Sequence, residues 1–231
     1  MTSLAMTLQT AIDAWGEQQR QSPLIELARR GELTPQALAL YLTSLQELFI
    51  QSQANLREAG TRAAAQGRSA LAQYFREKAR DELGHEQWAA SDLAKLPGRV
   101  THGRAPGRGC WRLSELQRQL LDEDPLCFAV YVVWAEYLTV LLGEEWLAAL
   151  AVSGYERSGL SAVSNHVEAD RDHASHGFAA LDALWTGEPA LKCLMASLER
   201  AERVFEEFCL EICQESQRTA ATCVPMATVN S

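Results

Sequence analysis

The 231-residue sequence lacks several features that mark common classes of protein. No stretch shows the period-two alternation of apolar and polar residues that is typical of a half-buried β-strand. Basic residues are outnumbered, with 21 Lys and Arg against 30 Asp and Glu, so the formal net charge is −9. Because nucleic acids and anionic membranes are bound by clustered basic side chains, this deficit predicts a small-molecule substrate, with no nucleic-acid or membrane partner.

The six cysteines follow neither the paired spacing of a zinc site nor the density of a small disulfide-stabilised domain. They indicate reduced thiols and a cytoplasmic protein. The N-terminal segment also lacks the basic start, apolar run and cleavage site of a secretion signal. The one long apolar run, 125–143, contains Glu136 near its centre, where a charge would be costly in lipid. It predicts a helix buried in a protein core.

Residues that favour helices occur almost throughout and predict an all-α fold. Thr34-Pro35 and Asp124-Pro125 each provide an N-cap followed by a proline in the first turn. The segment 98–112, rich in glycine and arginine, is expected to be a loop. Residues 1–217 are predicted to form a single-domain bundle of about seven helices, and 218–231 a disordered tail. Helices are expected at 4–20, 23–30, 35–66, 69–96, 114–121, 125–152, 159–185 and 189–217.

The segment HVEADRDHASH contains three of the five histidines and three carboxylates. On an α-helix, positions i, i+4 and i+7 project within an arc of about 60°, so His166, Asp170 and His173 share one stripe. Glu168 and Asp172 point away from it. Two imidazoles and a carboxylate form a ligand set that suits Fe(II) and leaves coordination positions open for oxygen. The alternative is a polar helix face that happens to carry histidine.

Carboxylates in other predicted helices extend this pattern. Glu82 and His85 form a Glu-x-x-His pair of the kind found in carboxylate-bridged dimetal bundles. Glu47 and Glu136 each lie among apolar residues, and a buried carboxylate is costly unless it is paired. No arginine lies in either helical neighbourhood, whereas a divalent cation would suit both residues. For Glu136 the alternative is a hydrogen bond from a buried Tyr or Trp.

The DELGHE helix, the lone glutamate in an apolar helix and the His-x-x-x-Asp-x-x-His spacing carry a family resemblance. From about residue 34 to 207, the chain resembles the haem-oxygenase-like diiron oxidases and oxygenases, which share their fold with TenA-type thiaminases and the pyrroloquinoline quinone synthesis oxidase. The resemblance implies one iron bound by Glu47 and His85. It implies a second iron bound by His166, Asp170 and His173, with Glu136 between the ions and Glu82 as an additional carboxylate ligand.

The same resemblance implies an O₂-dependent enzyme that uses two iron ions (Fe2+/Fe3+), the second of them loosely held. The expected reaction is oxidation of a small amino acid, amine or fatty acid, by N-oxygenation, desaturation or carbon–carbon bond cleavage, in a biosynthetic pathway of secondary metabolism. It also allows for an external electron donor and a homodimer. A substrate carboxylate would need a cation, for which Arg76, Arg80 and Arg171 are candidates.

Two other functions fit part of the sequence. Cys127 in DPLCFAVY and Glu206 in VFEEFC resemble the cysteine and C-terminal glutamate regions of a metal-free TenA-like hydrolase, with Cys127 as the nucleophile. The neighbouring sequence supplies no base to activate that thiol. A ferritin-like iron-binding bundle would use the same carboxylates, Glu82-x-x-His85 and Asp170-x-x-His173, but it leaves His166 unexplained.

Overall fold

Helix boundaries in the computed structural model, which describes residues 3–101 and 103–222, follow local sequence signals. Every regular element in these residues is helical, which confirms the all-α prediction. The elements are α1 (Leu4–Gln19), α2 (Pro23–Arg29), α3 (Pro35–Ala65), α4 (Ser69–Asp81), α5 (His85–Lys95), α6 (Gly98–Thr101), α7 (Arg108–Glu123), α8 (Pro125–Val152), the 3-10 turn η1 (Arg157–Gly159), α9 (Ser161–Leu184) and α10 (Leu191–Thr222).

The two Pro-initiated helices begin at the predicted residues. Thr34 Oγ1 accepts a hydrogen bond from Ala37 N at the start of α3, and Asp124 Oδ1 accepts one from Leu126 N at the start of α8. Each side chain thereby satisfies a backbone N–H that has no partner within its helix. The predicted spans of these two helices are confirmed.

The predicted spans of the helices on both sides of the expected loop are wrong, and the loop itself contains the short helix α6. The expected helix 69–96 is divided into α4 and α5, because Gly84 has a left-handed φ of 88° that ends one helix before the next begins. Helix α7 begins at Arg108, inside the expected loop, because the Glu211 carboxylate accepts hydrogen bonds from the backbone N–H groups of Arg108 and Gly109. Gly109 also packs so closely on α10 that an added Cβ would lie 2.6 Å from Phe208 Cα.

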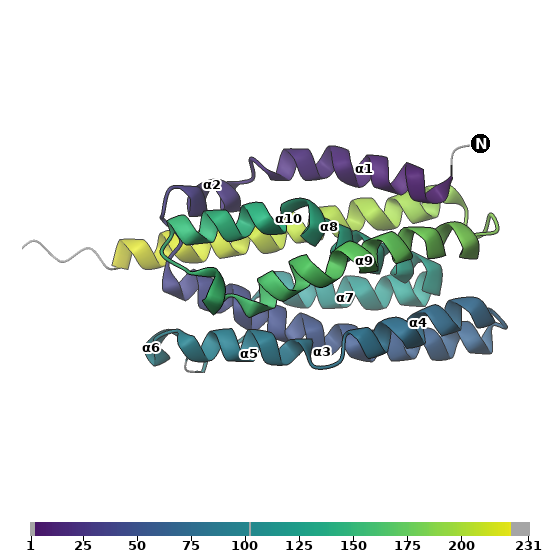
Figure 1. Cartoon of the computed structure of the whole chain (residues 1–231), viewed down its shortest axis with the longest axis horizontal. Helices are drawn as coiled ribbons and strands as arrows, with labels where there is room; N and C mark the ends of the chain where they lie inside the picture. The colour runs from purple at the N-terminus through teal and green to yellow at the C-terminus, as the bar shows by residue number, and fades with distance from the viewer. Residues whose placement is uncertain (1–2, 102, 223–231) are drawn as a thin grey trace, which may run out of the picture.

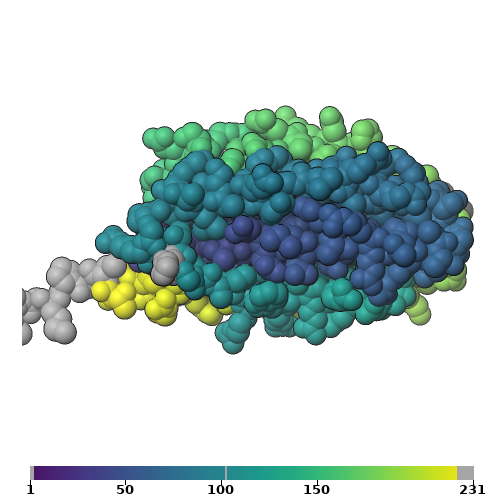
Figure 2. All heavy atoms as spheres, turned by 90° about the horizontal axis from the view of Figure 1, so that it is seen from below, coloured from purple at the N-terminus to yellow at the C-terminus, as the bar shows by residue number. Residues whose placement is uncertain are grey.

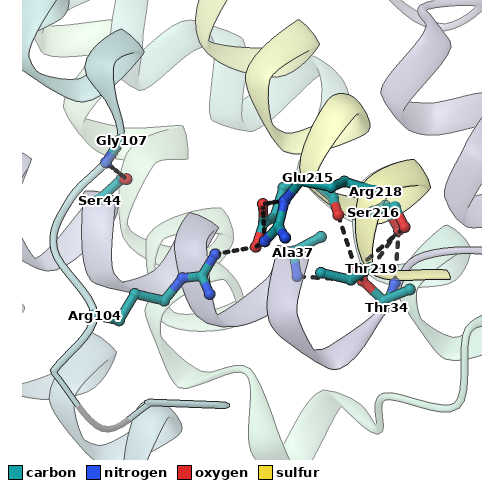
Figure 3. Close-up of polar contacts among 9 residues, drawn as sticks. All are labelled: Thr34, Ala37, Ser44, Arg104, Gly107, Glu215, Ser216, Arg218 and Thr219. Carbon is teal, nitrogen blue, oxygen red and sulfur yellow. Dashed lines mark hydrogen bonds and ion pairs between the residues drawn. The ribbon is translucent and has the colours of Figure 1, made fainter. Parts of the chain in front are cut away.

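Helix α10 continues to Thr222, through the first five residues of the predicted tail, so the tail prediction began too early. The reason is a polar contact with the start of α3 (Figure 3). Ser216 Oγ accepts a hydrogen bond from Thr34 N at 2.8 Å, and the Thr219 and Thr34 hydroxyls lie 2.7 Å apart. Arg104 pairs with Glu215 on the same turn of α10. Residues 223–231 lie outside the described residues.

The helices run roughly parallel to the long axis of the molecule (Figure 1). Helices α4 and α5 follow one another along the length of α3, and Figure 2 shows α3 between them and α7 on one face. Helix α8 lies in the interior, where almost every residue from Pro125 to Trp134 is buried. It is long and apolar enough to cross a membrane, but 72% of its most apolar 18-residue window is buried inside the fold. This agrees with the predicted core helix.

Candidate metal centre

The break between α4 and α5 brings Glu82 and His85 together. Glu82 is the C-cap of α4, Gly84 has a left-handed φ, and His85 is the first residue of α5. Glu82 Oε2 and His85 Nδ1 lie 3.0 Å apart, and both side chains are largely buried. Burial favours the protonated form of Glu82, but the hydrogen bond from His85 and the neighbouring imidazoles lower its pKa overall. Glu82 is therefore held as a carboxylate.

Helix α9 provides the stripe that its spacing predicts. His166 and Asp170 are buried and His173 is half-buried, whereas Glu168 and Asp172 are exposed. His166 Nδ1 lies 2.7 Å from Ala162 O, an atom that can only accept, so Nδ1 carries the proton and Nε2 keeps its lone pair. This is the arrangement that metal-binding histidines adopt, with the second nitrogen fixed by a backbone carbonyl.

Asp170 and His173 form a second oriented pair on α9. Asp170 Oδ1 accepts a hydrogen bond from His173 Nδ1 at 3.3 Å, and this contact raises the pKa of His173. Asp170 is only 2% exposed, so its carboxylate lies inside the fold. The pair therefore brings a carboxyl group and an oriented imidazole to the buried face of the helix.

Two groups of potential ligand atoms share one carboxylate. Glu82, His85 and His166 offer atoms that all lie within 4.8 Å of one another, and so do Glu82, Glu136 and His173. We call these the first and second subsites. Glu82 belongs to both, so the two subsites adjoin. With Asp170, which is hydrogen-bonded to His173, six of the seven predicted ligands lie together.

Two predicted ligands, Asp170 and Glu47, belong to neither group. Asp170 is hydrogen-bonded to His173, whereas Glu47 lies half-buried on α3, where its Oε1 accepts a hydrogen bond from Gln51 Nε2 at 2.7 Å. The expected pairing of Glu47 with His85 therefore differs from the observed grouping, in which His85 lies with Glu82 and His166. Phe49, from the same helix, reaches the centre instead and stacks on the His166 ring at 4.7 Å.

Glu136 has a cationic partner that the sequence pattern did not reveal. Lys78 Nζ donates to Glu136 Oε1 at 2.7 Å, and both side chains are more than 90% buried. The prediction that no arginine lies near Glu136 on its own helix holds, but a lysine from α4 takes the place of the expected cation. The other oxygen of Glu136, Oε2, is buried and has no hydrogen-bond partner in the part of the chain that the structure describes. Burial is the main cause that raises the pKa of Glu136 to about 7, opposed by Lys78 and assisted by Asp170 and Glu82.

A cavity of about 250 Å³ extends from the ligand residues into the bundle. Glu82, Glu136, His166 and Asp170 line one part of it. The remaining walls are mostly apolar and come chiefly from α3, α8 and α10, with Leu45, Leu48, Leu142, Trp146, Phe205 and Phe208 among them. Arg76, Arg80 and Arg171, proposed above as carboxylate partners, are exposed on the surface.

The residues of the alternative hydrolase site lie elsewhere. Cys127 is buried and does not line the cavity. Burial raises its pKa despite a hydrogen bond with Ser197, and a raised pKa disfavours the nucleophilic thiolate. Glu206 Oε1 accepts hydrogen bonds from Trp15 Nε1 and Gln19 Nε2, each at 2.9 Å. These contacts give Glu206 a structural role between α10 and α1.

The arrangement of helices is similar to that of two solved structures. A domain of unknown function with a haem-oxygenase-like fold from Shewanella denitrificans OS217 matches with a TM-score of 0.75 and 17% sequence identity, over 98% of this chain and 95% of that one. The chain has a haem-oxygenase-like fold. A TenA homologue from Pseudomonas syringae pv. tomato DC3000 matches with a TM-score of 0.68 and 16% identity, over 93% of each chain. No protein-family model and no curated protein matches the sequence.

At these identities the likeness concerns the haem-oxygenase-like fold alone, so the chemistry must be argued from this chain's own side chains. The residues present fit a pair of divalent cations. Three carboxyl groups, Glu82, Glu136 and Asp170, lie in this largely buried region, and among the described residues only Lys78 brings an ammonium to one of them, while Glu136 Oε2 has no hydrogen-bond partner there. Carboxylate oxygens and imidazole nitrogens together are donors that suit iron.

Proposed function

We propose that this haem-oxygenase-like protein is a non-haem diiron oxidase or oxygenase that uses O₂ to oxidise a small organic substrate. The observation that carries the proposal is the position of Glu82 in both subsites. A carboxylate has two oxygens, so Glu82 can serve two ions at once, as in other carboxylate-bridged dimetal bundles. His85 and His166 would complete the first subsite, and Glu136, His173 and Asp170 the second.

Each subsite offers three or four protein ligands, which would leave coordination positions open and so supports an oxidative role. Bound Fe(II) would supply the redox chemistry with O₂ that the side chains alone cannot provide. The protein orients the ligands: Ala162 O fixes the His166 ring, and Asp170 fixes that of His173. Trp88, stacked on His85 at 4.0 Å, and Phe49 limit the access of water to the first subsite.

The cavity favours one of the three expected substrate classes. Its walls are largely apolar, and its carboxyl groups and imidazole, from Glu82, Glu136, Asp170 and His166, belong to the predicted ligand set. An aliphatic chain would be buried favourably along such walls. The charged group of a fatty acid, an amino acid or an amine would be desolvated there in each case, so the longer apolar part of a fatty acid is what distinguishes it. We therefore propose a fatty acid, with its chain in the cavity and its reactive end beside the ligands.

Complete reduction of O₂ to water takes up more electrons than a single two-electron substrate oxidation releases. An external electron donor is therefore part of the proposal. A cytoplasmic location and a homodimer also remain part of it, on the sequence arguments given above.

The test is anaerobic loading of the full chain with Fe(II), followed by exposure to O₂ in the presence of fatty acids, amino acids and amines. We expect bound iron, a transient visible absorption, and a mass change in a fatty acid. Continued accumulation of ferric mineral would favour the ferritin-like alternative. A chain that binds no iron would contradict the proposal.

A further inference from the structure

Lys78 is a buried cation within the second subsite. The chain has three lysines, and this one is 5% exposed, on the inner face of α4. Its Nζ donates to Glu136 Oε1 at 2.7 Å and to His173 O at 3.4 Å. Burial of a lysine is costly unless its charge is compensated. Both acceptors belong to residues of the second subsite.

The two subsites differ in whether the Lys78 ammonium contacts their residues. In the first subsite, the Glu82 carboxylate contacts the His85 imidazole, and the rings of His85 and His166 lie edge to face. Lys78 is hydrogen-bonded to none of these three residues. In the second, the ammonium already occupies one oxygen of Glu136. A metal ion that bound Glu136 there would meet a positive charge only a few ångströms away, and the repulsion is strong in a region of low dielectric constant.

We propose that the Lys78 ammonium takes the place of a metal ion in the second subsite. One metal ion then binds tightly at the first subsite, and a second ion binds only by displacing the ammonium from Glu136. This inference rests on the proposed function, since it assumes that Glu82, His85 and His166 bind a metal. It assigns Lys78 a positioning role: the ammonium holds Glu136 and the His173 backbone in place until the second ion arrives.

The experiment compares wild-type protein with K78M, K78R and the control K192M, which removes an exposed lysine from α10. Each full-length chain is titrated anaerobically with Fe(II), and bound metal is quantified at each step. We expect one tight and one weak equivalent for the wild type, K192M and K78R. In K78M the second equivalent should bind with a Kd at least about tenfold lower, because the competing charge is gone.

A second-equivalent Kd that is unchanged or higher in K78M would overturn the inference while leaving the proposed function intact. Failure of every chain, wild type included, to bind the first equivalent would instead overturn the proposed function.

If K78M does not fold, wild-type protein labelled with 15N-lysine tests the same claim. Zn(II) serves as a diamagnetic probe. The hydrogen-bonded Lys78 Nζ signal should persist with one equivalent of Zn(II) and be lost or strongly shifted with the second. Loss of that signal with the first equivalent would contradict the proposed order of binding.

Discussion

Asp92 of α5 accepts hydrogen bonds from Ala162 N and Ser161 Oγ at the first turn of α9, each at 2.7 Å. Its side chain is fully buried. Asp92 belongs to α5, the helix that carries His85, and its carboxylate caps α9, the helix that carries His166. Because a capping carboxylate accepts from specific backbone N–H groups, it fixes the axial position of one helix relative to the other.

Replacing Asp92 should affect both stability and metal binding. We expect D92A to lower the free energy of unfolding by about 2 kcal/mol, since it removes a cap and leaves buried donors unsatisfied. It should also weaken the first metal equivalent, because α9 can then shift relative to His85. Urea unfolding and Fe(II) titration measure the two effects. D172A, at an exposed position on α9, is the control. Unchanged metal affinity in D92A would show that contacts other than this cap fix the position of α9 relative to α5.

The shared position of Glu82 predicts a graded loss of metal. E82A should lose both equivalents, because it removes a ligand from each subsite. H173A should lose the second equivalent and keep the first. E47A should keep both, although the family resemblance assigns Glu47 to one iron. Metal analysis of the four purified chains, wild type included, decides between the two ligand sets. Loss of iron in E47A with retention in E82A would favour the assignment implied by the resemblance.

The ligand stripe on α9 could be predicted from sequence because helical spacing alone determines which side chains share a face. The break in the DELGHE segment could not, because a single glycine is tolerated within many helices. From the sequence, Gly84 is indistinguishable from a residue inside a continuous helix. In the structure its left-handed φ creates the turn that brings Glu82 and His85 together. The start of α7 was missed for another reason: its cap, Glu211, lies about a hundred residues away in the sequence.

Helical spacing could have predicted that Lys78 lies on the same face as two of the ligands. Lys78, Glu82 and His85 are related by i, i+4 and i+7, the same intervals as His166, Asp170 and His173. The sequence-based prediction for Glu136 extended only to an arginine on the same helix. An ion pair between helices depends on their packing, which the sequence of one helix does not contain. Glu47 illustrates the opposite error, since apolar neighbours predicted a fully buried carboxylate where the structure has a half-buried one.

Glu202 gives the fold a pH dependence that is separate from the metal ligands. Its Oε1 is buried without a partner, and burial, with the charges of Glu199 and Glu206, raises its pKa from 4.5 to about 7. Between these values the folded chain retains a proton that the unfolded chain has released. This contribution to the free energy of unfolding is therefore complete below 4.5 and decreases as the pH rises to 7.

The isosteric variant E202Q removes this dependence. After allowance for its partial exposure to solvent, E202Q should be more stable than the wild type by about 1 kcal/mol at about pH 8, and similar to it at about pH 4. Urea unfolding of the metal-free proteins at both pH values measures the difference. A gain of equal size at both pH values would indicate a packing effect rather than a charge effect.

Cys127 distinguishes the oxidase from the hydrolase. Because its thiol is buried away from the cavity and its pKa is raised, C127S should retain iron binding and turnover, with a loss of stability of about 1 kcal/mol from the buried hydroxyl. H166A, in the same assay, should lose both iron and turnover. If turnover proceeds at the same rate with and without iron and C127S abolishes it, the cysteine mechanism is correct and the metal centre is not catalytic.

Leu142 tests the cavity apart from the metal ligands. It is 7% exposed and lines the apolar part of the cavity. In L142F the larger ring would occupy space that an aliphatic chain needs, at a cost to stability of about 1 to 3 kcal/mol from overpacking. We expect normal iron stoichiometry and a shift of turnover toward shorter fatty acids. L210F, at an exposed position on α10, should leave chain-length preference unchanged. If L142F keeps the wild-type preference while binding iron normally, the substrate does not enter this cavity, and the fatty-acid assignment loses its physical basis.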